Sequence, residues 1–153
     1  MVDRLSFRRA AAADAGAVLA LTRLAYAKWV PLIGREPKPM TVDYERAIAE
    51  HIVDLCEDGG ELLASIEMIP EVDCLLVENI AVRPDQQGRG IGSKLLHHAE
   101  SLAGSLGFGQ VRLYTNAAFQ SNLHFYIRRG YREFQRVAVA PGSLAVHLRK
   151  PID

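Results

Sequence analysis

Residues 77–92 read VENIAVRPDQQGRGIG, and this stretch decides the fold. Its first six residues have the apolar character of a strand, and they lead into a turn that contains Gly88, Gly90 and Gly92. A long amphipathic pattern, typical of a helix, follows the turn. Glycines let several backbone N–H groups point the same way, and a helix N-terminus adds partial positive charge, so such a turn can hold a phosphate without a cationic pocket. We therefore expect a phosphorylated ligand at this loop.

The spacing of the glycines separates three kinds of phosphate loop. A dinucleotide-binding loop requires G-x-G-x-x-G and an acidic residue about twenty residues later, and a nucleoside triphosphate loop ends in Gly-Lys followed by Ser or Thr. Neither pattern is present. The pattern that fits is Q-x-x-G-x-G, formed by Gln87, Gly90 and Gly92. It resembles the pyrophosphate loop of the GNAT superfamily of acetyl-CoA-dependent N-acyltransferases.

A second motif extends the resemblance beyond the loop. Residues 122–131 read NLHFYIRRGY, which is similar to the family's late Asn-x-x-x-Tyr-x-x-x-Gly-aromatic segment, and residues 77–82 resemble its fourth strand. A glycine-rich solvent turn is the alternative for the loop, but two motifs at a family-like separation favour the resemblance. The resemblance implies the GNAT fold, an α/β (α+β) domain with a mixed, mostly antiparallel central sheet of about seven strands and about four flanking helices. In that fold the fourth and fifth strands splay apart and admit the pantetheine arm of the cofactor.

The order of patterns along the chain agrees with that fold. Alternating apolar residues and turn signals predict strands over 5–9, 51–57, 61–69, 74–82, 110–115, 131–139 and 144–149. Helical stripes predict helices over about 15–25, 42–50, 91–106 and 119–129, with Asp14 and Thr41 as N-caps of the first two. Three prolines and a glycine predict that no regular element crosses residues 28–40. Because no repeat or linker interrupts this order, we expect residues 1–153 to form a single domain.

Charge, hydropathy and residue composition limit the classes of protein to which this chain can belong. The 18 basic and 18 acidic side chains cancel, so the overall charge indicates no nucleic-acid partner. No apolar run approaches the roughly 18 residues of a membrane span, and the N-terminus lacks a secretory core, so we expect a soluble, cytoplasmic protein without a membrane partner. The five histidines lack ligand-like spacing, and no metal site is assigned. Cys56 and Cys74 fall on the outer strands of a predicted three-strand meander, roughly 10 Å apart, and are interpreted as buried thiols.

The chemistry implied by the resemblance is transfer of an acetyl group from acetyl-CoA to a primary amine, by direct attack in a ternary complex. At pH 7 an alkyl amine with a pKa near 10.4 is almost entirely protonated, a handicap of roughly 4 to 5 kcal/mol that a base must offset. Glu78 is the candidate base, because alternation places it on the strand face of Ile80 and Val82, along which the resemblance implies that the pantetheine arm runs. A carboxylate that only ties the strand to its neighbours is the alternative. Glu67, on the adjacent strand, is the second candidate.

The resemblance also implies the residues that contact coenzyme A. Tyr126 aligns with the tyrosine that protonates the departing thiolate in many family members, and Asn122 aligns with an asparagine that contacts the cofactor; core packing is the alternative for the tyrosine. Backbone N–H groups near Ile80 are expected to hold the thioester oxygen. Arg83 is left open between a phosphate contact and a solvated side chain. The full set of expected contacts is Ile80, Ala81, Val82, Gln87, Gly88, Arg89, Gly90, Ile91, Gly92, Ser93, Asn122 and Tyr126.

The acceptor pocket is expected at residues 26–40, with Tyr26, Trp29 and Tyr44 either as an aromatic wall or as core residues. The sequence does not name the amine. The neutral charge favours a small molecule or a peptide α-amine over histone-like tails. The rival function is a non-catalytic acyl-CoA-binding sensor or scaffold module, which needs the same phosphate loop. The oligomeric state stays open, with a homodimer as one option.

Overall fold

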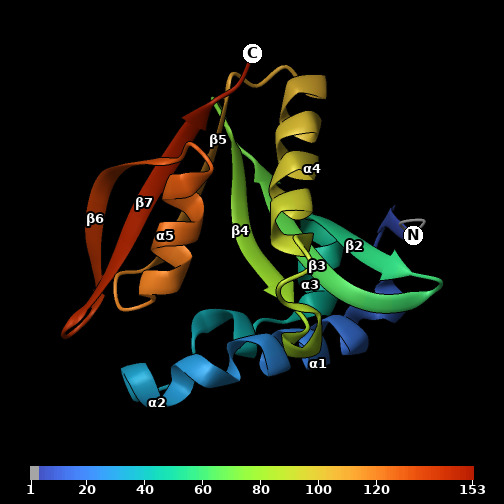
Figure 1. The fold of residues 1–153 in the computed structure, drawn as a ribbon, viewed down its shortest axis with the longest axis horizontal. Helices are drawn as coiled ribbons and strands as arrows, with labels where there is room; N and C mark the ends of the chain where they lie inside the picture. The colour runs from blue at the N-terminus through green and yellow to red at the C-terminus, as the bar shows by residue number, and fades with distance from the viewer. Residues whose placement is uncertain (1–3) are drawn as a thin grey trace.

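A computed structural model describes residues 4–153, which form a seven-stranded sheet with helices on both faces (Figure 1). The strands are β1 (Leu5–Arg9), β2 (Ile52–Asp58), β3 (Glu61–Pro70), β4 (Leu75–Val82), β5 (Gln110–Asn116), β6 (Arg132–Ala140) and β7 (Ser143–Pro151). The helices are α1 (Ala15–Tyr26), α2 (Val30–Ile33), α3 (Tyr44–Glu50), α4 (Ile91–Ser105) and α5 (Gln120–Arg128). Short 3-10 turns cover Ala12–Asp14, Ala27–Trp29, Lys38–Thr41 and Pro84–Gln86.

The strands lie in the order β1-β2-β3-β4-β5-β7-β6, and every neighbouring pair is antiparallel except β4 and β5, which are parallel. The mixed, mostly antiparallel sheet predicted from the sequence is therefore confirmed, with small shifts at the strand ends. Pairing between β4 and β5 covers only Leu75–Val77 and Val111–Leu113, although both strands continue further. Figure 1 shows the result: β1 to β4 with α4 lie on one side of an opening, and β6, β7 and α5 lie on the other. The predicted splay is confirmed.

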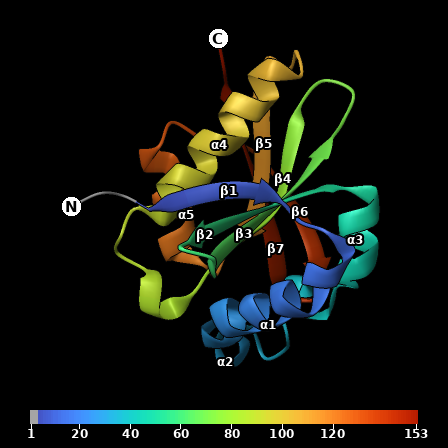
Figure 2. The same cartoon turned by 90° about the vertical axis from the view of Figure 1, so that its right-hand side faces the viewer.

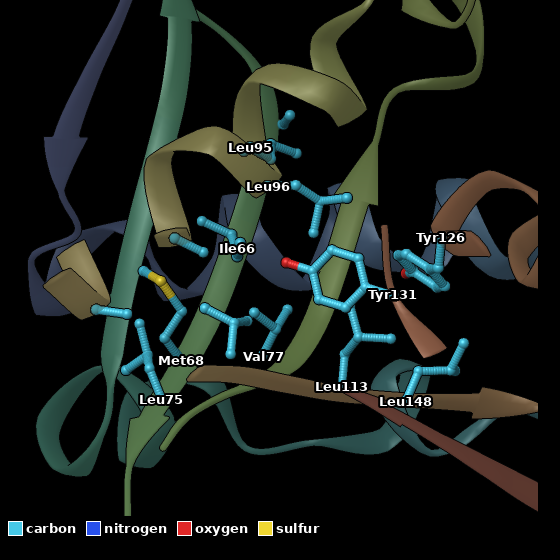
Figure 3. Packing of buried hydrophobic residues seen from close by; sticks show 14 of the residues in the cluster. Ile66, Met68, Leu75, Val77, Leu95, Leu96, Leu113, Tyr126, Tyr131 and Leu148 are labelled. Carbon is cyan, nitrogen blue, oxygen red and sulfur yellow. The ribbon is translucent and has the colours of Figure 1, made fainter. Parts of the chain in front are cut away.

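The larger core lies between α4 and the sheet. The stripe of α4 buries Ile91, Leu95, Leu96, Ala99 and Ala103. Figure 3 shows Leu95 and Leu96 of this stripe in the core with Ile66, Val77 and Tyr131. Because burying one leucine or isoleucine side chain stabilises by about 1.5–3 kcal/mol, this packing holds α4, and therefore its N-terminus, firmly against the sheet.

The opposite face of the sheet is covered by α1 and α3, as Figure 2 shows for α1 beneath the strands. Val18 of α1 packs with Val53 and Leu55 of β2, while Leu21 and Ala25 pack against β4 at Ala81. Composition and length alone mark the helical run 12–33 as apolar enough for a membrane span, with a mean hydropathy of 1.2. In the fold, the apolar side chains Val18, Leu21 and Ala25 of this run are buried within the domain.

A bulge in β4 changes the faces that the sequence predicts for this strand. Val77 pairs with Met68 and Asn79 pairs with Glu67, so Glu78 is an extra residue between the two pairs. Leu75 and Val77 pack under α4, and Ile80 and Val82 pack there too. The prediction that Glu78 shares a face with Ile80 and Val82 is therefore wrong, because the extra residue shifts the period-two alternation by one. Glu78 points to the other side of the sheet.

One prediction on the helices is refined and another is corrected. No regular element crosses residues 28–40, but the four-residue α2 and 3-10 turns occur within them; Pro31 fits the first turn of α2, where a backbone N–H is not needed. Thr41 does not cap α3, because its hydroxyl donates to the Lys38 carbonyl instead. The N-cap is Asp43, whose carboxylate accepts from the backbone N–H of Arg46.

The residue expected to cap α1, Asp14, also uses its side chain for other contacts. Asp14 precedes α1 as predicted, yet its carboxylate makes no cap bond to that helix. It accepts from the N–H of Ala11, the residue directly before the 3-10 turn, and forms a bidentate ion pair with Arg8. These donors, Arg8 foremost, lower the pKa of Asp14 to about 2. Its role is to fasten the chain between β1 and α1.

Candidate functional site

A cleft of about 470 Å³ opens beside the end of β4, where this strand no longer pairs with β5, and we call it the loop-side cleft. The end of β4, the glycine loop, α5 and the end of α1 line it. Nine of the residues predicted from the sequence as ligand contacts meet there: Ile80, Val82, Gln87, Gly88, Gly90, Ile91, Gly92, Asn122 and Tyr126. The two motifs, which are far apart in the sequence, therefore face one cavity.

Three predicted contact residues do not line the loop-side cleft. Ala81 is buried against Leu21 and Ala25, because alternation turns it to the α1 side of β4. Arg89 is exposed and lies against Gln86 and Asp58. Ser93 lies on the first turn of α4 next to the cleft, and its hydroxyl accepts a hydrogen bond from Arg129.

The glycine loop has a backbone that other residues rarely adopt. Gly88 and Gly90 have φ values of 89° and 75°, and Gly90 is the N-cap of α4. The first intrahelical bond of α4 runs from the Lys94 N–H to the Gly90 carbonyl, so the preceding N–H groups of the helix have no partner of this kind. These groups lie at the positive end of a 15-residue helix. The loop is thus a preorganised site for an anion.

Gly92 is needed for a different reason. A Cβ at Gly92 would lie 2.9 Å from Cζ of Phe125, because α5 packs directly on the first turn of α4. This approach brings Asn122 and Tyr126 of α5 next to the loop.

Two cations that the sequence reasoning missed, Lys28 and Arg129, also line this cleft, and Arg129 is held in place by several contacts. Its Nε donates to Ser93 Oγ at 2.9 Å, another guanidinium nitrogen donates to the Phe125 carbonyl at 3.0 Å, and the guanidinium carbon lies 3.7 Å from the centre of the Phe125 ring. The spacing of Asn122, Tyr126 and Arg129 at i, i+4 and i+7 is a signal that could have revealed it, because such residues share one helix face.

Arg83, left open as a phosphate contact, is engaged elsewhere. Its guanidinium pairs with Glu61 and Asp85, and it also donates to the Leu62 carbonyl. These contacts tie the end of β4 to the start of β3, so Arg83 does not line the loop-side cleft.

Tyr126 is only 9% exposed and lies with its ring edge toward Phe125 and Tyr131. Burial raises the pKa of its hydroxyl to about 12, so the group is protonated at neutral pH. Within residues 4–153, the hydroxyl makes no hydrogen bond to another side chain or to the backbone, although the residue lines the cleft. A protonated hydroxyl at such a position can donate to a group that enters the cleft.

The backbone of β4 exposes polar groups to the opening. Because the Arg83 N–H donates to the Leu63 carbonyl of β3, alternation turns the polar groups of Ile80 and Val82 away from β3. The Tyr26 hydroxyl agrees with this direction, since it donates to the Ile80 carbonyl at 3.0 Å and Tyr26 belongs to α1 rather than to β3. The N–H groups of Ile80 and Val82 thus face the space that β5 has left.

A second cavity of about 270 Å³ lies on the other side of the splayed strands, and we call it the Glu78 pocket. The Glu78 side chain, 15% exposed, accepts from the Tyr114 hydroxyl at 2.6 Å and from the Lys38 ammonium at 3.3 Å. Burial and this bond to Glu78 raise the pKa of Tyr114. The two donors hold the carboxylate in one place beside the cavity.

The two cavities share a wall. Tyr26 lines both of them, and Trp29, which lines the loop-side cleft, stacks at 4.2 Å on Phe119, which lines the Glu78 pocket. Burial raises the pKa of Tyr26 well above its usual value. Tyr26 and Trp29 therefore form part of the aromatic wall considered from the sequence.

Two other residues considered from the sequence belong to the core. Tyr44 is 3% exposed and donates to the Pro39 carbonyl, while the buried amide of Asn79 links Tyr44 to Tyr26. Glu67 is buried with its Oε2 2.7 Å from His51 Nδ1, and burial raises its pKa. Glu67 lines neither cavity. Among residues 4–153, no group of three or more His, Cys, Asp or Glu side chains is arranged to hold a metal ion.

Comparison with known proteins agrees with this arrangement. Residues 19–131 match the family model of the acetyltransferase (GNAT) family. A search of curated proteins gives no match. Among solved structures, the PaiA N-acetyltransferase from Thermoplasma acidophilum, in complex with coenzyme A, is similar over 96% of this chain and 98% of its own, with a TM-score of 0.80 and 15% identity.

Two further structures have the same fold. The ribosomal-protein-S18-alanine N-acetyltransferase from Escherichia coli matches 97% of this chain and 94% of its own, with a TM-score of 0.77 and 19% identity. A GNAT acetyltransferase from Elizabethkingia anophelis with acetyl-CoA bound matches 99% of this chain and all of its own, with a TM-score of 0.73 and 17% identity. The ligands of the Thermoplasma and Elizabethkingia proteins agree with the acetyl-CoA expected from the loop. Since the family model also spans most of the sequence, the chain belongs to the GNAT family of acetyltransferases.

Proposed function

We propose that residues 1–153 form one domain that transfers the acetyl group of acetyl-CoA to a primary amine, either a small molecule or an α-amine, by direct attack in a ternary complex. The observation that carries the proposal is the pair of cavities that share the wall of Tyr26, Trp29 and Phe119. One cavity has a preorganised anion site, and the other has a fixed carboxylate. A cytoplasmic location belongs to the same proposal as an expectation from the sequence, and a homodimer stays one option for the oligomeric state.

The residues of the loop-side cleft fit acetyl-CoA. The open N–H groups at the start of α4 would bind the pyrophosphate, and Arg129 and Lys28 would add positive charge at the same cleft. The outward N–H groups of Ile80 and Val82 would bind the pantetheine arm and the thioester oxygen. One preorganised donor at a developing oxyanion is worth about 2.7 to 4 kcal/mol in an acyl transfer.

The Glu78 pocket fits an amine. A carboxylate that is 15% exposed attracts the ammonium form and then accepts a proton, directly or through a water, so that the neutral nitrogen can attack the carbonyl carbon. The C–N bond forms, the C–S bond breaks, and the Tyr126 hydroxyl donates a proton to the sulfur. Starting from the ammonium, the nitrogen loses two protons in total: the first passes to Glu78 and on to solvent, and the second leaves the nitrogen after the attack. The sulfur gains one proton from Tyr126, and Tyr126 regains one from solvent, so that one proton is released overall.

The alternative for Glu78 has its own support. Its bonds to Tyr114 of β5 and to Lys38 of the 38–41 turn join three segments around the opening, which is a structural role. The pH dependence of the rate separates the two roles, because only a base loses its importance when the amine deprotonates in solution.

The direct test is release of free thiol from acetyl-CoA by the purified protein in the presence of a panel of primary amines. Turnover with at least one amine, and its loss in Tyr126→Phe with coenzyme A affinity retained, is the expected result. The rival, a sensor or scaffold module that binds acyl-CoA, predicts tight binding of coenzyme A without turnover for every amine. Gly104→Ala, at a position of α4 with open space around it, serves as the control for a harmless change in the same helix.

A further inference from the structure

The charge of the Glu78 pocket is not balanced. Two cations, Arg35 and Lys38, and one carboxylate, Glu78, line it, which leaves one positive charge in excess. Lys38 pairs with Glu78. Arg35 has only a neutral partner, since its guanidinium donates to Ser143 Oγ at 3.2 Å, and within residues 4–153 it forms no ion pair. An amine that brings no negative charge would leave Arg35 without a counterion.

Tyr26, Tyr114, Thr115 and Asn116 also line the pocket, and one part of its wall is apolar and open. Val139 of β6 and Leu144 of β7 are 56% and 40% exposed, although both are large apolar residues, and both line the Glu78 pocket beside Phe119. Exposed apolar side chains that converge on one cavity indicate an apolar group in the ligand. The pocket of about 270 Å³ is therefore lined by a carboxylate, an apolar wall and a guanidinium that, within residues 4–153, binds a hydroxyl but no carboxylate.

From these features we propose that the acceptor is a free α-amino acid with an apolar side chain, and that Arg35 binds its carboxylate and so determines specificity. The inference rests on the proposed acetyltransferase function. Glu78 faces the amine, Arg35 faces the carboxylate, and Phe119, Val139 and Leu144 contact the side chain. An arginine fork matches a carboxylate in geometry as well as in charge. The pocket thus disfavours peptide N-termini and polyamines, which carry no carboxylate next to the reacting amine.

The test compares apolar amino acids with their amides. Leucine, methionine and phenylalanine are each paired with leucinamide, methioninamide and phenylalaninamide, and kcat/KM is measured by thiol release at one fixed pH. Because the amide also lowers the pKa of the amine, the informative quantity is the ratio of kcat/KM for the acid to that for the amide, compared between wild type and Arg35→Gln. The intrinsic basicity of each amine cancels in that comparison.

We expect Arg35→Gln to lower the acid-to-amide ratio by roughly tenfold or more, since a hydrogen bond to a charged group contributes at this level. Arg35→Lys should lower the ratio less, because it keeps the charge without the fork. Arg128→Gln, which changes an exposed arginine of α5 outside both cavities, should leave the ratio unchanged. Coenzyme A affinity should stay constant in all three variants.

Each other result has a distinct meaning. A ratio that is the same in wild type and Arg35→Gln, or turnover only with amines that lack a carboxylate, would overturn this inference and leave the acetyltransferase proposal intact. No thiol release with any class of amine, in a protein that binds coenzyme A, would overturn the proposed function and this inference with it.

Discussion

The anion site of the loop-side cleft is built mainly from backbone, whereas the Glu78 pocket is built from side chains. In the first, Gly88 and Gly90 set the conformation and the open N–H groups of α4 supply the donors. In the second, the chemical groups come from Arg35 and Lys38, which follow α2, from Glu78 of β4 and from Tyr114 of β5, so that three separate segments of the chain supply them. A backbone site can bind the same ligand whatever its neighbours are, while a side-chain site can change with each substitution. The difference indicates that the fold determines which acetyl donor binds, whereas a few side chains determine which acetyl acceptor binds.

Glu78→Gln should have the largest effect, because it removes the carboxylate of the side-chain-built pocket. A general base contributes about 10²–10⁴ in rate, so we expect the variant to lose roughly a hundredfold or more near pH 7. The loss should shrink as the pH rises toward the pKa of the amine, near 10.4 for an alkyl amine and near 8 for an α-amine. Full pH–rate profiles with one acceptor of each kind measure this, and coenzyme A affinity should not change.

An equal defect at every pH would contradict the role of Glu78 as base. Gln can still accept from Tyr114, so a loss of structure is not expected from this change. A uniform defect would then mean that the carboxylate positions the acceptor or the strand, and that the amine loses its proton elsewhere.

Tyr126→Phe should give the next largest effect. The ring stays in the core, but the proton donor for the departing sulfur is lost, so turnover should fall on the order of 10² with little change in coenzyme A affinity. Single-turnover kinetics and calorimetry separate the two quantities. Tyr131→Phe is the matched control, because it also removes a buried hydroxyl, one that binds Glu100 outside both cavities. Equal turnover in wild type and Tyr126→Phe would mean that Tyr126 only packs in the core and donates no proton in the reaction.

The two regions also differ in how much of them could be predicted from the sequence. The glycine loop and the 122–131 motif are local, so they carry the family resemblance in the sequence itself, and nine of the contacts that this resemblance implied line one cleft. Arg129 was missed because cations were sought next to the loop in sequence, whereas α5 brings this one there by packing on Gly92.

The Glu78 pocket depends on contacts between distant segments. The bulge that turns Glu78 away from Ile80 exists only in the pairing of β4 with β3, so no pattern within 77–82 signals it. The bonds from Lys38 and Tyr114 to Glu78 likewise depend on the fold as a whole. At the cap of α3, the sequence reasoning chose Thr41, whereas the helix begins two residues later and has Asp43 as its N-cap.

Gly90→Val tests the backbone side of the comparison. At φ 75° a β-branched residue is strained, so the loop should rearrange and coenzyme A should bind more than about tenfold more weakly. Circular dichroism should show the fold largely retained, because nothing lies within 4 Å of a Cβ at this position. Gly104→Ala, with open space and an ordinary helical backbone, should bind coenzyme A as wild type does. Wild-type affinity in a folded Gly90→Val protein would remove the loop from the binding site.

The smallest expected effect concerns the support of α4 behind the loop. Buried Asp54 of β2 lies 2.6 Å from Nε2 of His98 on α4 and also pairs with Arg9 of β1, while the His98 ring stacks on Phe7. Burial alone would raise the pKa of Asp54, but the bonds from His98 and Arg9 outweigh it and lower the pKa. Because the pKa of Asp54 is lower in the folded than in the unfolded protein, this stabilisation is complete at a pH above the unfolded-state pKa, near 3.9. It is lost as the pH falls through the folded-state pKa.

Asp54→Asn should therefore reduce the free energy of unfolding by about 1–3 kcal/mol at pH 7, measured in urea, and the difference from wild type should narrow below about pH 4. Glu133→Gln, which breaks an exposed pair with Arg136, should leave stability nearly unchanged because solvent screens that pair. With saturating acetyl-CoA, turnover of Asp54→Asn should match wild type, since the change touches neither cavity. If turnover falls at pH 7 while the stability does not, the contact between Asp54 and His98 acts on the chemistry rather than on the anchoring of α4. A side-chain contact behind the loop would then contribute to the acetyl-donor site, and the contrast between a backbone-built donor site and a side-chain-built acceptor site would be wrong.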